Sequence, residues 1–122
     1  MKPKSFVVYV DGIYIKNKRM LVLKRSTDPF KGFWHVIGGQ VKDNETLKEA
    51  LVREFKEETN LEVKVGKIVA GRFEETFDQK KIIIAFKITS AKGKIELNSE
   101  SEEFKWVKNF PPKSVYNYFQ HL

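Results

Sequence analysis

The segment from Thr46 to Asn60, TLKEALVREFKEETN, constrains the fold more than any other part of the chain. It opens with a capping box, in which the Thr46 hydroxyl accepts a hydrogen bond from the amide three residues on while the Glu49 side chain reaches back. Asn60 suits the left-handed position at which many helices end. The sequence therefore predicts an α-helix over about residues 46–59.

Leucines and glutamates share one stripe of this predicted helix. At about 100° per residue, side chains spaced four, three and four positions apart lie on one face, as in a buried stripe. The members of the stripe are Leu47, Leu51, Glu54 and Glu58, with Glu57 one step to the side. The opposite face is predicted to carry Lys48, Lys56 and Thr59.

Carboxylates that continue a buried stripe repel one another and lose hydration, which is costly unless a cation neutralises them. A merely solvated acidic face would lie opposite the leucines. Oxygen ligands favour a hard cation, and Mg²⁺ binds through a few carboxylates while keeping waters for a phosphate substrate. Arg53, next to Glu54, is placed to pair with a carboxylate and fix its rotamer. The helix thus indicates a divalent-metal site, with a structural salt-bridge cluster as the alternative on geometry alone.

Strand patterns flank the helix on both sides. Apolar and β-branched runs predict strands within residues 5–25, as a hairpin or meander with its turn at KNKR, and at 34–37, 61–77, 80–88, 95–97 and 104–107. The segment PPKSVYNYFQHL predicts a short C-terminal helix entered through proline. These elements predict an α/β or α+β fold with a mixed sheet, and the length of 122 residues favours one domain over residues 1–122.

Composition narrows the functional classes. No apolar run approaches the length of a membrane span, so we expect no membrane association, and the short apolar run after the basic N-terminus reads as a strand instead of a signal peptide. The absence of cysteine excludes disulfides, thiolate metal sites and cysteine nucleophiles, and we expect a cytoplasmic protein. The net charge of +7 suits anionic partners such as nucleotides or RNA, although lysines also serve solubility.

A spaced motif covers the helix and the loop before it. Gly39, five further residues, Glu45, seven further residues and the run REFKEETNL from Arg53 to Leu61 resemble the Nudix box, whose run reads REUXEEXGU with U aliphatic. Every charged position of that pattern is present. The resemblance implies a Nudix-like α/β/α sandwich with a mixed sheet, a catalytic helix at about residues 46–59 and a C-terminal helix.

The sequence departs from the Nudix pattern at four positions. Phe55 replaces an aliphatic residue and Asn60 replaces a glycine, changes that preserve burial and helix-ending geometry. Ile37 stands where a proline commonly precedes the glycine pair, and Lys42 where many members carry an acid. We expect the second pair of changes, Ile37 and Lys42, to alter loop rigidity and substrate choice.

The resemblance implies an enzyme that hydrolyses a nucleoside diphosphate linked to another group, by attack of water on phosphorus. It implies Mg²⁺, or Mn²⁺ in its place, held by Glu54, Glu57, Glu58 and the carbonyl of Gly38. Glu54 is the candidate for water activation, while Arg53 and Glu45 orient the cluster. Glu100 matches an acid outside the box that joins the metal or acts as base, the alternative being a plain acidic loop.

Candidate substrate contacts lie near the box. Arg25, Lys31 and Gly39 are predicted to contact phosphate or substrate, with surface charge as the alternative for the two cations. His35 and His121 are expected to be structural.

Family signs for particular substrates are mostly missing. ADP-ribose enzymes of the family tend to carry a proline some way after the box, but this chain has no proline between Pro29 and Pro111. Dinucleoside polyphosphate enzymes tend to carry a tyrosine there, but this chain has no tyrosine between Tyr14 and Tyr116. By elimination the sequence favours a nucleoside di- or triphosphate, in the manner of MutT. The alternatives are an RNA 5′-end pyrophosphohydrolase and a non-catalytic nucleotide-binding module, and a homodimer stays open.

Overall fold

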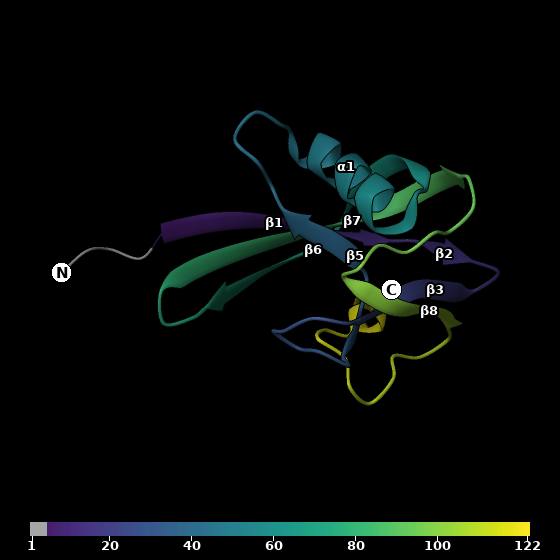
Figure 1. The fold of residues 1–122 in the computed structure, drawn as a ribbon. Coiled ribbons are helices and arrows are strands. Elements are labelled where there is room, and N and C mark those ends of the chain that lie inside the picture. Colours follow the sequence, from purple (N-terminus) through teal and green to yellow (C-terminus); the bar gives the residue numbers. More distant parts are fainter. Residues whose placement is uncertain (1–4) are drawn as a thin grey trace.

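A computed structural model describes residues 5–122 as two β-sheets and one α-helix, followed by a short 3-10 turn (Figure 1). The elements are β1 (Ser5–Ile13), β2 (Ile15–Lys16), β3 (Arg19–Arg25), β4 (Trp34–His35), β5 (Ile37–Gln40), α1 (Leu47–Thr59), β6 (Glu62–Glu75), β7 (Gln79–Lys92), β8 (Ser101–Val107) and the 3-10 turn η1 (Tyr118–His121).

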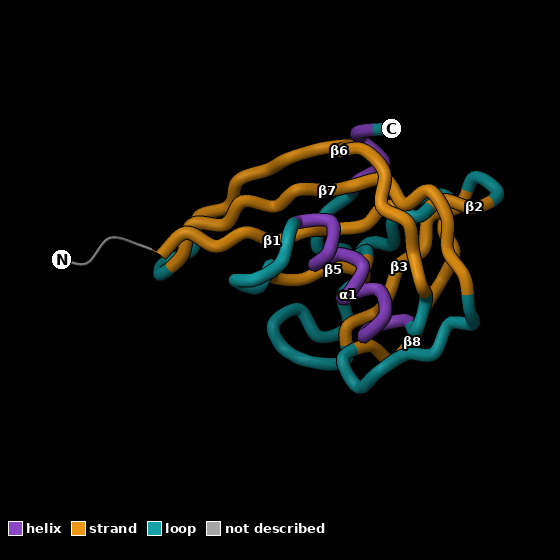
Figure 2. The backbone as a smooth tube through the Cα atoms, turned by 90° about the horizontal axis from the view of Figure 1, so that it is seen from above, coloured by secondary structure: helices purple, strands orange, loops and turns teal. Residues whose placement is uncertain are grey.

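The larger sheet is mixed. Its strand order is β5-β1-β7-β6, in which β1 and β7 run parallel and the other neighbours antiparallel. The smaller sheet has β3 at its centre, with β2, β4 and β8 paired to it antiparallel. Helix α1 lies over one face of the larger sheet, whose β1, β6 and β7 extend beyond it as an arm (Figures 1 and 2).

Two apolar clusters hold the layers together. One lies between α1 and the sheets and is centred on Val10, Leu51 and Phe55. The other lies around Met20, Trp34 and Tyr118, and brings the C-terminal turn into the core. A Cβ at Gly12 in β1 would stand 2.3 Å from the Phe55 ring, so a glycine there lets α1 pack closely on the strand. This close packing sets the height of the helix above β1 and β5.

The mixed α+β fold and the helix prediction are confirmed. Thr46 and Glu49 form the capping box, and Asn60 takes the left-handed conformation with φ of 66°. The prediction that Thr59 lies on the face opposite the leucines, toward solvent, is wrong. Thr59 is fully buried, and its hydroxyl is satisfied there, since it donates to the Phe55 carbonyl at 2.6 Å and accepts from the Leu61 amide at 3.2 Å.

Three other predictions need correction. The strands before residue 25 form a hairpin only between β2 and β3, with Asn17 and Lys18 in left-handed conformation at the turn, while β1 joins the other sheet. Residues 95–97 form no strand, and the Glu96 amide there donates to the Thr59 carbonyl at the end of α1. The C-terminal helix is reduced to the turn η1, whose Asn117 side chain caps the Phe119 amide.

Within residues 5–122, no helix has the length and apolar character that a membrane span requires.

Candidate active site

Arg53 is the hub of an ion-pair network on α1. Its Nε and Nη2 donate to both oxygens of Glu45, at 3.0 and 2.7 Å, in a bidentate contact. Its Nη1 donates to Glu54 at 2.9 Å and to Glu57 at 3.2 Å, and Nη2 also donates to the Gln40 carbonyl at 3.1 Å. One guanidinium therefore orients three carboxylates and ties the helix to the end of β5.

The network sets the charge state of its members. The hydrogen bond from Arg53 lowers the pKa of Glu45 to about 2, and the backbone amide of Lys42, which donates to Glu45 at 2.7 Å, adds to that effect. Contact with Glu45 likewise raises the pKa of Arg53. Arg53 and Glu45 therefore stay ionised at neutral pH, and their task here is to orient the other acids.

Glu54 and Glu58, one turn apart, form a carboxyl pair. Burial raises the pKa of Glu58 well above its ordinary value, and the charge and hydrogen bond of Glu54 raise it further. Burial also raises the pKa of Glu54, while hydrogen bonds with Glu58 and Arg53 oppose that rise. The two carboxyl groups are therefore joined by a hydrogen bond, and burial raises the pKa of both.

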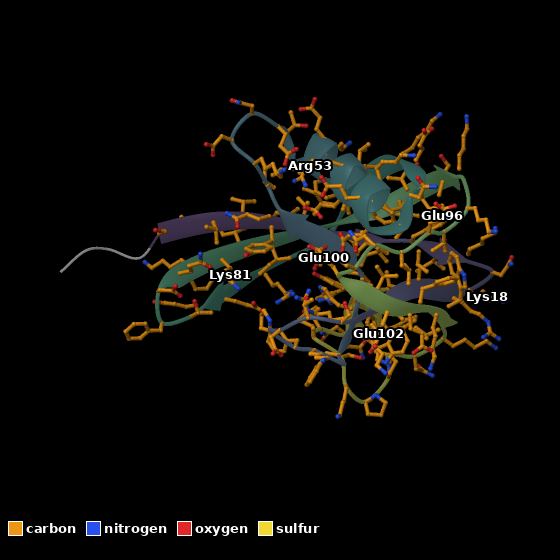
Figure 3. All side chains as sticks on the ribbon, in the orientation of Figure 1. Lys18, Arg53, Lys81, Glu96, Glu100 and Glu102 are labelled. Atoms are coloured by element: carbon orange, nitrogen blue, oxygen red, sulfur yellow. The ribbon has the colours of Figure 1, made fainter. Side chains whose placement is uncertain are left out.

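Two acids from other parts of the chain face this pair. The charges of Glu100, just before β8, and of Asp11, in β1, both contribute to the raised pKa of Glu58. Figure 3 shows Glu100 between α1 and the start of β8, below Arg53. Glu100 also lines an open groove of about 510 Å³ together with Glu54, Glu57 and Arg53. The groove is therefore acidic on several sides.

The glycine pair before the helix separates the groove from a second pocket. A Cβ on Gly39 would stand 2.3 Å from the Glu54 carboxylate, and one on Gly38 would stand 2.3 Å from the Asp11 carboxylate. Side-chain oxygens therefore approach the backbone of β5 at both glycines. Any larger residue at either position would collide with an acid.

The second pocket, of about 280 Å³, lies against Gly38 and Gly39 and is bordered by Asp11, Arg25 and Arg72. Tyr9, Phe30, His35 and Lys81 also line it. It combines guanidinium and ammonium groups with aromatic rings and with the carboxylates of Asp11 and Glu74. The cations and rings suit a ligand carrying both a negative charge and a flat apolar part.

Asp11 anchors the wall of that pocket and was missed by sequence reasoning. Its Oδ2 accepts a hydrogen bond from the Tyr118 hydroxyl, lies 3.2 Å from His35 Nε2 and 3.9 Å from Arg72 Nη2. Burial raises the pKa of Tyr118, and the Asp11 charge raises it further. An acid inside the apolar run of β1 was the available signal, because a buried acid needs partners.

The acids fit a divalent cation in their chemistry. Glu58 Oε2 is buried without a hydrogen-bond partner in the described chain, and a raised carboxyl pKa marks a group that a cation would deprotonate. Within residues 5–122, however, no three acidic or histidine side chains stand in metal-ligand spacing, and Glu57 pairs with Arg53 and keeps a half-exposed side chain. Glu54 and Glu58 would be the first ligands, and Glu57 would have to turn inward.

The predicted substrate contacts divide into two groups. Arg25 lines the second pocket, held by a hydrogen bond of 2.7 Å from its Nε to the Pro29 carbonyl, and Gly39 lies between the pocket and the glutamates. Lys31 is exposed in the loop before β4 and does not border that pocket. His35 contacts Asp11, and His121 stacks on Tyr116 at 5.8 Å, so both histidines have protein partners.

Comparison with known proteins agrees with this geometry. Residues 6–120 match the NUDIX domain family, and the chain therefore belongs to it. The prediction of a Nudix-type hydrolase is confirmed at the level of the family.

Relatives with assigned activities and a solved structure resemble the chain. It is 48% identical over 62 residues to an ADP-ribose pyrophosphatase of Methanocaldococcus jannaschii, a match covering 51% of this chain but 37% of that protein. It is 28% identical to the nucleoside triphosphatase NudI of Escherichia coli, over 88% of this chain and 79% of that one. The MutT protein of Methanosarcina mazei Go1 has 30% identity and a TM-score of 0.78, over 88% and 80% of the two chains.

Proposed function

We propose that this protein is a Mg²⁺-dependent hydrolase that cleaves a phosphoanhydride bond in a nucleoside di- or triphosphate. The observation that carries the proposal is the pairing of Glu54 with Glu58, whose inner oxygen has no partner in the described chain. A protein that only bound nucleotides would gain nothing from such an uncompensated acid. Mn²⁺ is the expected substitute, because both ions accept oxygen ligands.

The chain's own residues divide the work of hydrolysis. Glu54, Glu58 and Glu57, with the Gly38 carbonyl as a further ligand, would hold Mg²⁺, which when bound would supply charge neutralisation of the diphosphate. Glu54 is the candidate to take the proton of the attacking water, because burial raises its pKa and so makes its carboxylate a stronger base. Arg53 and Glu45 hold the rotamer of Glu54, and Glu100 adds a carboxylate from the far wall.

The second pocket takes the remainder of the substrate in this proposal. Arg25, at its border, contacts phosphate, and the aromatic side chains beside it take the nucleoside. The nucleoside triphosphatase NudI, aligned over most of its length, supports a nucleoside triphosphate. The shorter match to an ADP-ribose pyrophosphatase makes ADP-ribose the second compound to test.

Hydrolysis of a substrate panel tests the proposal. The purified full chain would be incubated with Mg²⁺ and nucleoside di- and triphosphates, ADP-ribose, dinucleoside polyphosphates and 5′-triphosphorylated RNA, with release of phosphate and pyrophosphate followed. We expect one class to be cleaved efficiently, with Glu54→Gln at least about 10²-fold slower in kcat. Glu62→Gln, the same change at an exposed position on β6, serves as the matched control and keeps the wild-type rate.

Cation binding supplies a second readout. Because a ligand that binds only the native state stabilises it, millimolar Mg²⁺ or Mn²⁺ is expected to raise the Tm of the wild type and not that of Glu54→Gln. A wild-type protein that cleaves nothing in the panel and shows no such shift would refute the enzyme proposal and leave a nucleotide-binding module.

A further inference from the structure

The segment between β7 and β8, residues 93–100, carries Glu100 to the acid cluster without regular structure. Two backbone hydrogen bonds hold this segment, one to α1 and one to the residue after β3. The Glu96 amide donates to the Thr59 carbonyl at 2.9 Å at the end of α1, and the Ser26 amide donates to the Glu100 carbonyl at 2.9 Å beyond β3. Between these points, one side chain makes contacts in both directions.

That side chain is Asn98. Its Nδ2 donates to the Glu57 carbonyl on α1 at 3.0 Å, and its Oδ1 accepts from the Glu100 amide at 2.9 Å. The second contact is a local turn of the kind asparagine and aspartate form with the amide two residues on. The first contact bridges 41 positions of the sequence. A single planar amide thus joins the helix that bears the metal-binding acids to the backbone of Glu100.

The chemistry of the two contacts selects asparagine. One partner is a carbonyl and needs a donor, while the other is an amide and needs an acceptor, so the orientation of the Asn98 amide group is determined by its surroundings. Aspartate would keep the acceptor for Glu100 but would set a negative oxygen against the Glu57 carbonyl. Alanine would remove both contacts. The Glu57 carbonyl is also one of those at the end of α1 without an intrahelical partner, so the contact caps the helix.

The position of this bridge matters for the acid cluster. Glu57 and Glu58 are neighbours on α1, and the charge of Glu100 reaches Glu58 strongly enough to contribute to its raised pKa. Like charges on Glu100 and the glutamates of the helix repel one another, and Asn98 supplies a direct link from the Glu100 backbone to α1, whereas the Ser26 amide links it to the end of β3. The side chain of Asn98 is uncharged and touches none of the acid oxygens, so it acts through the backbones that carry them.

We propose that Asn98 is a positioning residue that holds Glu100 at the catalytic glutamates. The inference rests on the proposed hydrolase function and assigns a task to a residue outside the Nudix box. Glu100 is the residue that meets substrate or metal, and Asn98 sets its distance from α1.

A double-mutant cycle between Asn98→Ala and Glu100→Gln tests this inference in the full chain, with the substrate identified from the panel. We expect Asn98→Ala to lower kcat by about 10- to 100-fold, as loss of an outer contact to a metal site commonly does, with KM little changed. In the Glu100→Gln background the same substitution should have little further effect, because the group that it positions is already gone. Lys94→Ala, an exposed change in the same segment, should keep the wild-type kcat.

Asn98→Asp separates the two contacts. It keeps the turn to Glu100 and loses the donor to Glu57, so we expect a fall in kcat at least as large as that of Asn98→Ala. Hydrogen exchange of the peptide spanning residues 94–104 should rise in both variants while the Tm of each stays above the assay temperature.

The positioning role of Asn98 and the hydrolase function can fail separately. Wild-type kcat in Asn98→Asp, or additive effects of Asn98→Ala and Glu100→Gln, would overturn the positioning role while leaving the hydrolase intact. An inactive wild type would instead refute the proposed function, and with it the role of Asn98. A loss of kcat in Asn98→Ala that disappears in the Glu100→Gln background would establish the role.

Discussion

Asp11, which is buried, and Glu58, which has a buried inner oxygen, differ in the partners that the fold gives them. Asp11 on β1 is supplied with partners from three distant parts of the protein, namely Tyr118, His35 and Arg72. Glu58 on α1 has an inner oxygen without a partner and neighbours of its own charge. A buried acid that the protein satisfies serves the fold, whereas one that it leaves unsatisfied marks a place for a ligand.

Removal of the charge at Asp11 should give the largest loss of stability. Asp11→Asn removes the buried negative charge that the Tyr118 hydroxyl and Arg72 contact, and loss of such a charge costs about 3 kcal/mol although Arg72 keeps its ion pair with Glu74. Urea unfolding at pH 7 would measure the change. Asp78→Asn, in the exposed turn between β6 and β7, is the control and should be nearly neutral. If Asp11→Asn were as stable as wild type, Asp11 would not serve the fold.

The glycine pair should separate folding from activity. A Cβ at Gly38 would stand 2.2 Å from the backbone oxygen of Val10, so Gly38→Ala must shift a strand and should cost about 2 kcal/mol. The atoms nearest to a Cβ at Gly39 belong to the movable end of the Glu54 side chain, so Gly39→Ala should fold almost normally and lose most hydrolysis. Unfolding curves and kcat for both variants would check this pair. Equal losses of stability would refute it.

Removal of the ionisable group at Glu58 should stabilise the protein at high pH, whereas removal of the charge at Asp11 destabilises it. Because burial and Glu54 raise its pKa in the folded protein, the folded state keeps a proton that the unfolded state has lost above about pH 4.3. The free energy of unfolding therefore falls as pH rises from the unfolded pKa to the folded pKa of Glu58. The fall is about 1.4 kcal/mol for each tenfold difference in proton affinity between the folded and unfolded states. Glu58→Gln removes this loss.

Urea unfolding of wild type and Glu58→Gln at pH 5 and pH 8, in the presence of EDTA, measures the effect. The variant should be the more stable at pH 8 and inactive, with a smaller advantage at pH 5. A variant less stable than wild type at pH 8 would show that Glu58 serves the fold as Asp11 does.

Glu45→Gln should change the stability least, and it should destabilise the protein at neutral pH, unlike Glu58→Gln. The Arg53 contact lowers its pKa to about 2, so its contribution to stability is present above the unfolded pKa of about 4.3 and is lost as pH falls toward 2. Wild type should be more stable than Glu45→Gln at pH 7, and the difference should disappear near pH 2. Thermal unfolding across this range would show it, and a difference that persists at pH 2 would mean that charge is not its source.

The helix and its network were open to prediction because their interactions are local. Thr46, Glu49 and Asn60 act within one turn of the helix ends, and Arg53 reaches Glu45 and Glu57 eight and four positions away. Capping, helical periodicity and the spaced acids therefore determined α1, its acidic stripe and the family from the sequence alone.

The surroundings of the acids were decided by the tertiary structure. The hydrogen bond from Tyr118 to Asp11 joins residues 107 positions apart, and that from Asn98 to Glu57 joins residues 41 apart. Thr59 is buried because the segment after β7 folds back over the end of α1. Such contacts follow from the parallel pairing of β1 with β7 and the closure of long connections, for which neither residue type nor periodicity carries a local signal. The sequence by itself determined which acids α1 presents, and the fold decided which of the buried acids are satisfied.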